Sequence, residues 1–222
     1  MTAYEFYWIS GSPNAWRAML TLEIKGVSYV SHRIDPSEGG HKTPEFLAMN
    51  PRGKVPVLKD GGVVVHESLA IMAYLERKHP DPPLFGTTVV ETGLIWQRTF
   101  EVMNYVRDPI DNGVVRPLYR GKATSEASAI QAAAVEVHEG FGWIEQVLAR
   151  TPYLAGAALS AADVATMPII QGLVRALGRP DSAPLDLGFL PLEKRYPSIA
   201  AWLRRLESLP VYDKAAPPHW RE

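Results

Sequence analysis

The chain has 222 residues, among them 23 lysines and arginines against 24 aspartates and glutamates. This length allows one large domain or two small ones, and the balanced charge offers no basic surface for DNA, RNA or an anionic membrane. The sequence contains no cysteine, which excludes disulfides, zinc–thiolate sites and a protein thiol nucleophile. It shows no secretory leader and no apolar run near the roughly 18 residues that span a bilayer. We therefore expect a cytoplasmic protein without nucleic-acid or membrane partners.

The first part of the chain begins with the pattern strand, helix, strand. Residues 4–9 are aromatic and β-branched, and they stop at a Ser-Gly-Ser-Pro turn that starts at Ser10. Helical spacing follows as far as Gly26, with Ser12 at the cap position and a proline in the first turn. Residues 27–34 predict a second strand. Two strands joined through a helix indicate a parallel crossover unit.

A short helical connector leads to a predicted hairpin and a further helix. Two apolar runs, residues 55–58 and 63–66, flank an Asp-Gly pair that is typical of a tight turn. A helix capped by Ser68 follows and runs out near Pro80. This order predicts a four-stranded sheet with helices on its faces, which we assign to a first domain of residues 1–81.

After a stiff Asp-Pro-Pro break, every periodic segment is helical. These segments are residues 89–106, which stop at Asp108-Pro109, residues 124–149, a helix that starts with Ser160-Ala-Ala-Asp163, and residues 198–209. The pattern predicts a second domain of unlike class, all-α, over residues 88–222.

Four local motifs together resemble the cytosolic glutathione transferase superfamily, and the resemblance covers nearly the whole chain. The first motif, Ser12-Pro13-Asn14-Ala15-Trp16-Arg17, is similar to the turn where theta-, zeta- and omega-like members place a catalytic serine or cysteine. The second, Asn50–Leu58, is similar to a family segment with a cis proline, and the third, Glu67-Ser68, to the pair that receives the γ-glutamyl end of glutathione. The fourth, Leu159–Asp163, is similar to a helix-capping box. The resemblance implies a serine-type, bacterial-like member, with a thioredoxin-like N-terminal domain that binds glutathione as co-substrate and an all-α C-terminal domain.

The implied binding site has fittings for each part of the tripeptide. A cis Val55–Pro56 bond would turn the backbone groups of Val55 toward an extended ligand. Glu67 would meet the ligand's amine, and Ser68 with the free amides of a helix N-terminus would hold its γ-glutamyl carboxylate. The candidates for the glycine carboxylate are His41, Lys42 and Lys54. Each assignment has an alternative. Pro56 could be an ordinary trans proline at a sheet edge, and Ser68 could only cap a helix. The side chains of His41, Lys42 and Lys54 could simply be solvated.

Ser12 is the candidate catalytic residue. A thiol with a pKa near 8.5 is only a few per cent thiolate at neutral pH. A hydroxyl that donates to the sulfur at a helix N-terminus favours the anion, and a shift of two pKa units takes roughly 2.7 kcal/mol. The alternatives are a plain cap at Ser12, Ser10 in its place, or an amide from Asn14. Because Asn14 stands where zeta-like members carry cysteine, a zeta-type isomerase is disfavoured. Tyr7 lies inside the strand pattern and is expected to pack.

The leading functional interpretation is an enzyme of detoxification that attacks a small hydrophobic electrophile with glutathione thiolate. Its second pocket is expected between the domains, bounded by the Ser10–Ser12 turn and the helices near Val102–Arg107 and Tyr119. A glutathione-dependent isomerase or dehalogenase, or a non-catalytic binding protein, are the alternatives on the same scaffold. The histidines lack the spacing of a metal site. The family and the apolar excess in residues 89–106 predict a two-fold homodimer.

Overall fold

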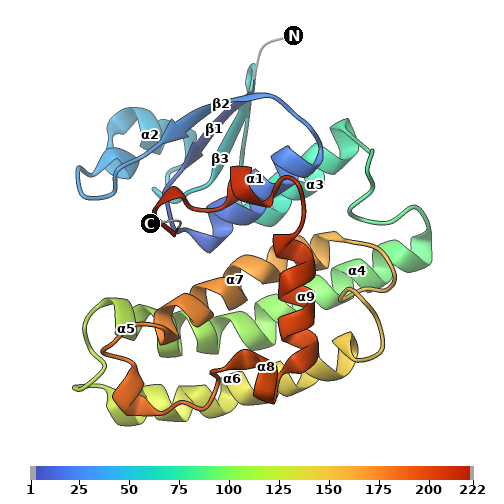
Figure 1. The fold of residues 1–222 in the computed structure, drawn as a ribbon. Coiled ribbons are helices and arrows are strands. Elements are labelled where there is room, and N and C mark those ends of the chain that lie inside the picture. The colour runs from blue at the N-terminus through green and yellow to red at the C-terminus, as the bar shows by residue number, and fades with distance from the viewer. Residues whose placement is uncertain (1–3, 221–222) are drawn as a thin grey trace. The chain divides into compact units, whose positions relative to one another are not determined.

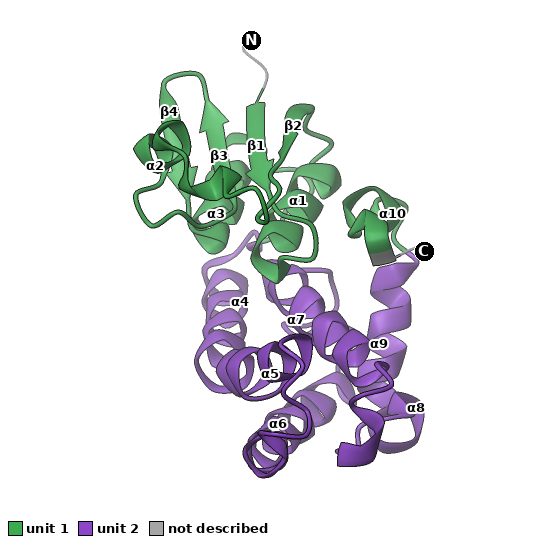
Figure 2. Ribbon diagram, turned by 90° about the vertical axis from the view of Figure 1, so that its left-hand side faces the viewer, with its two compact units in different colours: residues 1–84, 209–222 green, residues 85–208 purple. Residues whose placement is uncertain are grey.

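The computed structural model describes residues 4–220 (Figure 1). The chain divides into two compact units, residues 1–84 with 209–222 and residues 85–208 (Figure 2). The last fourteen residues, which the sequence pattern assigns to the helical domain, thus group with the first unit. The reason is apolar packing of a short helix, α10 (Tyr212–Ala215), against α1 (Pro13–Ile24), with the rings of Trp16 and Tyr212 5.9 Å apart.

The first unit is built on a four-stranded mixed sheet of order β2-β1-β3-β4. Its strands are β1 (Tyr4–Trp8), β2 (Tyr29–Arg33), β3 (Val57–Asp60) and β4 (Val63–His66). β2 runs parallel to β1, while β3 is antiparallel to both β1 and β4. The predicted crossover unit and hairpin are therefore confirmed, and together they give the thioredoxin-like sheet.

Three helices accompany this sheet: α1, α2 (Pro44–Met49) and α3 (Ser68–Lys78). Figure 1 shows α1 and α3 together on one side of the sheet. The strand β1 alternates buried and half-buried residues, as expected for a strand with one fully covered face. Phe6 and Leu58 lie opposite each other in the sheet and are fully buried. The opposite face carries Tyr7, whose ring meets Phe46 of α2 at 6.3 Å.

The second unit is built from helices, with one isolated β-bridge between Tyr153 and Gly156. Its main elements are α4 (Val89–Glu101), the π-helical stretches η2 (Val102–Val106) and η3 (Pro109–Val115), α5 (Arg116–Tyr119), α6 (Ala127–Leu148), α7 (Ala161–Leu177), α8 (Leu192–Arg195) and α9 (Pro197–Glu207). No helix in the described part of the chain has both the length and the apolar character to cross a membrane. The all-α prediction for this part of the chain is confirmed.

The predicted helix end at Asp108-Pro109 is wrong. The helical path that starts at Val89 continues without a break to Tyr119, and Pro109 opens the π-helical stretch η3. A proline has no N–H to donate and crowds the preceding turn, so it kinks or ends a regular α-helix. A π-helical turn shifts the hydrogen-bond pattern and accommodates such a local interruption.

The predicted capping box at the start of α7 is confirmed. The Asp163 carboxylate accepts from the backbone N–H of Ser160 at 3.0 Å and from its hydroxyl at 2.8 Å. Asp163 is fully buried, and α7 is buried along most of its length. The box therefore fixes the start of a core helix, a structural role.

Candidate functional site

The candidate segments meet at the carboxyl end of β1. Tyr7 pairs with Val57 at the start of β3, and Val57 pairs in turn with His66 at the end of β4. On the other side, Trp8 pairs with Arg33 at the end of β2. Four segments therefore leave the sheet at the same end of its strands: the turn after β1, the segment before β3, the segment after β4 and the connector after β2. All four belong to the first unit.

The turn after β1 presents the Ser12 hydroxyl at the N-terminus of α1. Ser12 is the cap residue, with φ −76° and ψ 116°, and its Oγ accepts from the backbone N–H of Ala15 at 3.3 Å. Among the described residues, nothing accepts the hydroxyl proton of Ser12. Gly11 before it has φ +82°, a conformation that favours glycine. The turn thus leaves one hydroxyl donor unengaged at the positive end of a helix.

The two rivals of Ser12 differ in their surroundings. Ser10 Oγ lies 2.8 Å from Nδ1 of His219, so its hydroxyl is already engaged. Asn14 is exposed, and its side-chain amide has no hydrogen-bond partner in residues 4–220. The proximity of His219 to this turn could not be predicted from sequence, because a contact across 209 positions leaves no local pattern.

The segment before β3 leaves the backbone of Val55 outside the sheet. The Val55–Pro56 bond is cis, and β3 begins only at Val57. Asn50, which is 2% exposed, shapes this loop: its side-chain amide donates to the Lys54 carbonyl at 2.7 Å, and its Oδ1 accepts from the Arg52 amide at 3.2 Å. Asn50 was part of the recognised motif but not of the predicted site. Its two bonds hold the loop so that the Val55 backbone groups have no partner in the described structure.

After β4, helix α3 starts one residue earlier than predicted. Ser68 is the first residue of α3 rather than its cap, and Glu67 occupies the cap position. The Glu67 carbonyl accepts from the Ile71 amide at 2.9 Å, and no side chain caps the helix. Glu67 has φ +71°, a strained conformation for a residue with a side chain, which costs about 1–3 kcal/mol and often marks a functional position. Ser68 is 7% exposed, and no described residue bonds its hydroxyl.

Two lysine side chains lie near this end of the sheet without a carboxylate partner among the described residues. Lys42 and Lys54 are exposed, and neither forms an ion pair within the part of the chain that the structure describes. A Cβ on Gly53 would lie 2.7 Å from Lys42 Nζ, so the glycine admits this side chain next to the loop before β3. His41 is half-buried, and its Nδ1 has no hydrogen-bond partner there. These groups suit an incoming carboxylate.

Tyr7 packs in the sheet, as expected. Its hydroxyl donates to Glu5 at 2.9 Å, and its ring stacks on His32 with centroids 4.4 Å apart. Burial and the bond to Glu5 raise the pKa of Tyr7 to about 12. A tyrosine that is bound to a carboxylate is a poor donor to a thiolate, so Tyr7 does not replace Ser12.

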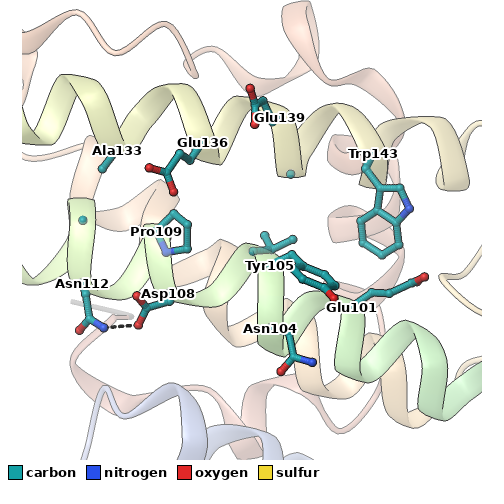
Figure 3. Close-up of a pocket in the computed structure, with 13 residues that line it drawn as sticks. Glu101, Asn104, Tyr105, Asp108, Pro109, Asn112, Ala133, Glu136, Glu139 and Trp143 are labelled. Atoms are coloured by element: carbon teal, nitrogen blue, oxygen red, sulfur yellow. Dashed lines mark hydrogen bonds between the residues drawn. The ribbon is translucent and has the colours of Figure 1, made fainter.

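The second unit contains a hollow of about 890 Å³ between the π-helical stretches and α6 (Figure 3). Its polar lining includes the carboxylates of Glu101, Asp108, Glu136 and Glu139, and neither lysine nor arginine. Such a lining repels the carboxylates of glutathione. Tyr105 also lines the hollow, but Tyr119 does not. The expected pocket between the domains stays a prediction.

Known proteins share both the sequence and the fold. Residues 11–78 match the family model "Glutathione S-transferase, N-terminal domain", and residues 127–205 match "Glutathione S-transferase, C-terminal domain". The chain is 31% identical to glutathione S-transferase A of Pleuronectes platessa, over 97% of this chain and 92% of that protein. It is 32% identical to glutathione S-transferase 1 of Dianthus caryophyllus, over 86% and 83%. The crystal structure of a glutathione S-transferase from the Antarctic clam Laternula elliptica superposes with a TM-score of 0.82 at 32% identity, covering 100% of this chain and 95% of that one.

Proposed function

Because this chain belongs to the glutathione S-transferase family, we propose that it binds glutathione at the carboxyl end of β1 and uses its thiol to attack a small electrophile. The observation that carries the proposal is the Ser12 hydroxyl, whose proton has no acceptor among the described residues. This donor stands at the N-terminus of α1, where the helix dipole also favours an anion. This arrangement supports a serine-type catalytic turn.

Ser12 acts by stabilising the thiolate and not by covalent attack. Its O–H donates to the glutathione sulfur, and the bond is stronger to the charged sulfur than to the neutral thiol. The thiol proton leaves to solvent, and the sulfur forms the new bond to the electrophilic carbon as the leaving group departs. The exposed amide of Asn14 is a second donor that can face the same sulfur.

The remaining groups match the charges of the tripeptide. Glutathione carries two carboxylates and one ammonium group. Glu67 would bind the ammonium group, and the buried Ser68 with the first amides of α3 would receive the neighbouring carboxylate. Lys42, Lys54 and His41 would bind the glycine carboxylate at the far end. The backbone of Val55, next to Pro56, would pair with the cysteinyl residue in the middle of the tripeptide.

The wider organisation follows from the same family. We propose residues 1–81 as the glutathione-binding domain and residues 88–222, apart from the C-terminal segment that groups with the first unit, as the domain that holds a hydrophobic electrophile, in a cytoplasmic enzyme of detoxification. We also propose a two-fold homodimer, because Val89 and Val90 at the start of α4 are 89% and 80% exposed.

Retention on immobilised glutathione and turnover of a panel of electrophiles test the proposal. We expect the wild-type protein to be retained and active, and Ser12→Ala to be retained but nearly inactive. Ser208→Ala, which changes an exposed serine of the second unit, is the matched control and should behave as wild type. A protein that is not retained, or a fully active Ser12→Ala variant, would overturn the proposal.

A further inference from the structure

The C-terminal segment of the chain lies on the turn that carries Ser12. Its helix α10 packs on α1, and Ala215 and Ala216 are buried there. The short 3₁₀ turn η5 (Pro218–Trp220) follows and brings His219 to the turn. Nδ1 of His219 lies 2.8 Å from Ser10 Oγ. Both groups belong to the first unit.

The imidazole of His219 also touches the residue between the two serines. A Cβ on Gly11 would lie 3.2 Å from Cε1 and 3.5 Å from Nε2 of His219. The ring therefore sits against the glycine while its other nitrogen bonds Ser10. A side chain at position 11 would crowd the ring, and the φ of +82° there would be strained for a residue other than glycine.

We propose that His219 is a positioning residue of the thiol-activating turn, an inference that rests on the proposed role of Ser12. The bond to Ser10 and the contact with Gly11 hold the turn in the conformation that presents the Ser12 hydroxyl. The C-terminal segment thereby becomes part of the catalytic apparatus of the first unit without touching the reacting sulfur.

The contact with His219 supports the part of the turn before Ser12, because Ser12 itself is already held by the Trp16 amide on its carbonyl at 2.9 Å and by the Ala15 amide on its Oγ at 3.3 Å. Glycine has the widest backbone freedom of any residue, and Gly11 lies directly before the donor. Within the turn, the Ser12 amide donates to the Ile9 carbonyl at 3.2 Å, and the Ser10 side chain has His219 as its partner. A donor that is aimed in advance stabilises developing charge better than one that must reorient. Loosening the turn should therefore slow the reaction more than it weakens binding.

The contact is expected to persist when the imidazole changes its protonation state. A serine hydroxyl can donate to a neutral Nδ1 or accept from a protonated one. His219 therefore acts through position, and its effect should be present across the neutral range. An asparagine places an amide near the position of Nδ1, whereas phenylalanine keeps a ring against Gly11 without a hydrogen bond. These two replacements separate the bond from the packing.

The experiment compares His219→Ala, His219→Asn, His219→Phe and Ser10→Ala with the double variant of Ser10→Ala and His219→Ala. Lys214→Ala, which changes an exposed residue of α10 outside this contact, is the matched control. For each purified full-length protein, kcat with a fixed electrophile, the dissociation constant of glutathione and the pKa of the bound thiol are measured. The thiol pKa is the readout that a merely structural role would not move.

We expect His219→Ala to lower kcat about two- to ten-fold, the effect of a single neutral hydrogen bond, and to raise the pKa of the bound thiol. Glutathione affinity should stay within about two-fold. Ser10→Ala should have the same effect, and the double variant should be no worse than either single one, because both changes break one contact. His219→Asn should restore kcat. His219→Phe should resemble His219→Ala, and the control Lys214→Ala should resemble wild type.

Wild-type kcat and thiol pKa in His219→Ala would overturn the inference, as would additive losses in the double variant. His219→Phe with full activity would also overturn it, because packing alone would then suffice. Ser12→Ala distinguishes the two proposals. If Ser12→Ala is crippled and His219→Ala is not, only the role of His219 fails. If Ser12→Ala is fully active, the proposed function of the turn fails, and the inference with it.

Discussion

Replacing Asp163 tests how strongly one buried carboxylate holds the helical unit together. Its Oδ1 accepts from the Leu154 amide at 2.9 Å and from the indole N–H of Trp202 at 2.8 Å. Its Oδ2 accepts from the amide and the hydroxyl of Ser160. Burial raises the pKa of Asp163, and the four donors oppose that shift. The carboxylate thus joins the start of α7, the preceding loop and α9 within the second unit.

The expected loss follows from counting donors. Alanine leaves the three N–H donors without an acceptor, since only the Ser160 hydroxyl can turn elsewhere. Each unsatisfied buried donor costs about 1–3 kcal/mol, so Asp163→Ala should lower the free energy of unfolding by at least about 3–5 kcal/mol. Asparagine keeps the oxygen that serves Leu154 and Trp202 and sets its amide against the Ser160 amide. Asp163→Asn should therefore lose about 1–3 kcal/mol.

Urea unfolding, followed by tryptophan fluorescence and circular dichroism, measures the difference. The matched control is Asp181→Ala, because Asp181, whose side chain is 37% exposed, pairs with Arg179 and its loss should leave the unfolding midpoint nearly unchanged. An Asp163→Ala variant within about 1 kcal/mol of wild type would refute the reasoning. Equal losses for alanine and asparagine would refute the assignment of donors to the two oxygens.

Three further predictions concern binding, pH and assembly. Ser68→Ala should weaken glutathione binding by about 1–3 kcal/mol in calorimetry with little change in the unfolding midpoint, since Ser68 makes no cap bond; unchanged affinity would remove Ser68 from the site. Burial lowers the pKa of His138, so the unfolded state binds this proton more readily, and stability should fall as the pH drops from about 6.5 through the folded-state pKa. His138→Gln should flatten that slope, and an unchanged slope would contradict the assignment. Wild-type protein should sediment as a dimer at micromolar concentration and Val90→Asp as a monomer; a monomeric wild type would contradict the proposed assembly.

The first unit could be predicted from sequence because its signals are local. The turn that begins at Ser10, the Asp-Gly hairpin and the apolar runs each specify structure within a few residues, and the sheet pairing confirms them. The predicted start of α3 is one residue too late. Serine is a common cap residue, which favours Ser68 at the cap position, but Glu67 with its strained backbone occupies that position.

The remaining differences arise from packing and hydrogen bonding that no short window contains. Pro109 is a helix breaker by type, yet π-helical turns carry the helix through it. The segment that contains α10 follows a helical domain in the sequence but packs on α1 of the first unit. The bond between Ser10 and His219 depends on that packing, so neither residue could be paired with the other from sequence.

The pKa of the thiol of bound glutathione tests the central claim most directly. Titration of the thiolate absorbance, in wild-type protein and in Ser12→Ala, gives this value without an electrophile. We predict a bound-thiol pKa about two units below the free value near 8.5 in the wild type, and a rise of about one unit or more in Ser12→Ala. Glutathione affinity should stay within a few-fold, while turnover falls roughly ten- to a thousand-fold, as for the loss of one aimed donor. The same bound-thiol pKa in both proteins would contradict the account, because Ser12 would then be only a helix cap.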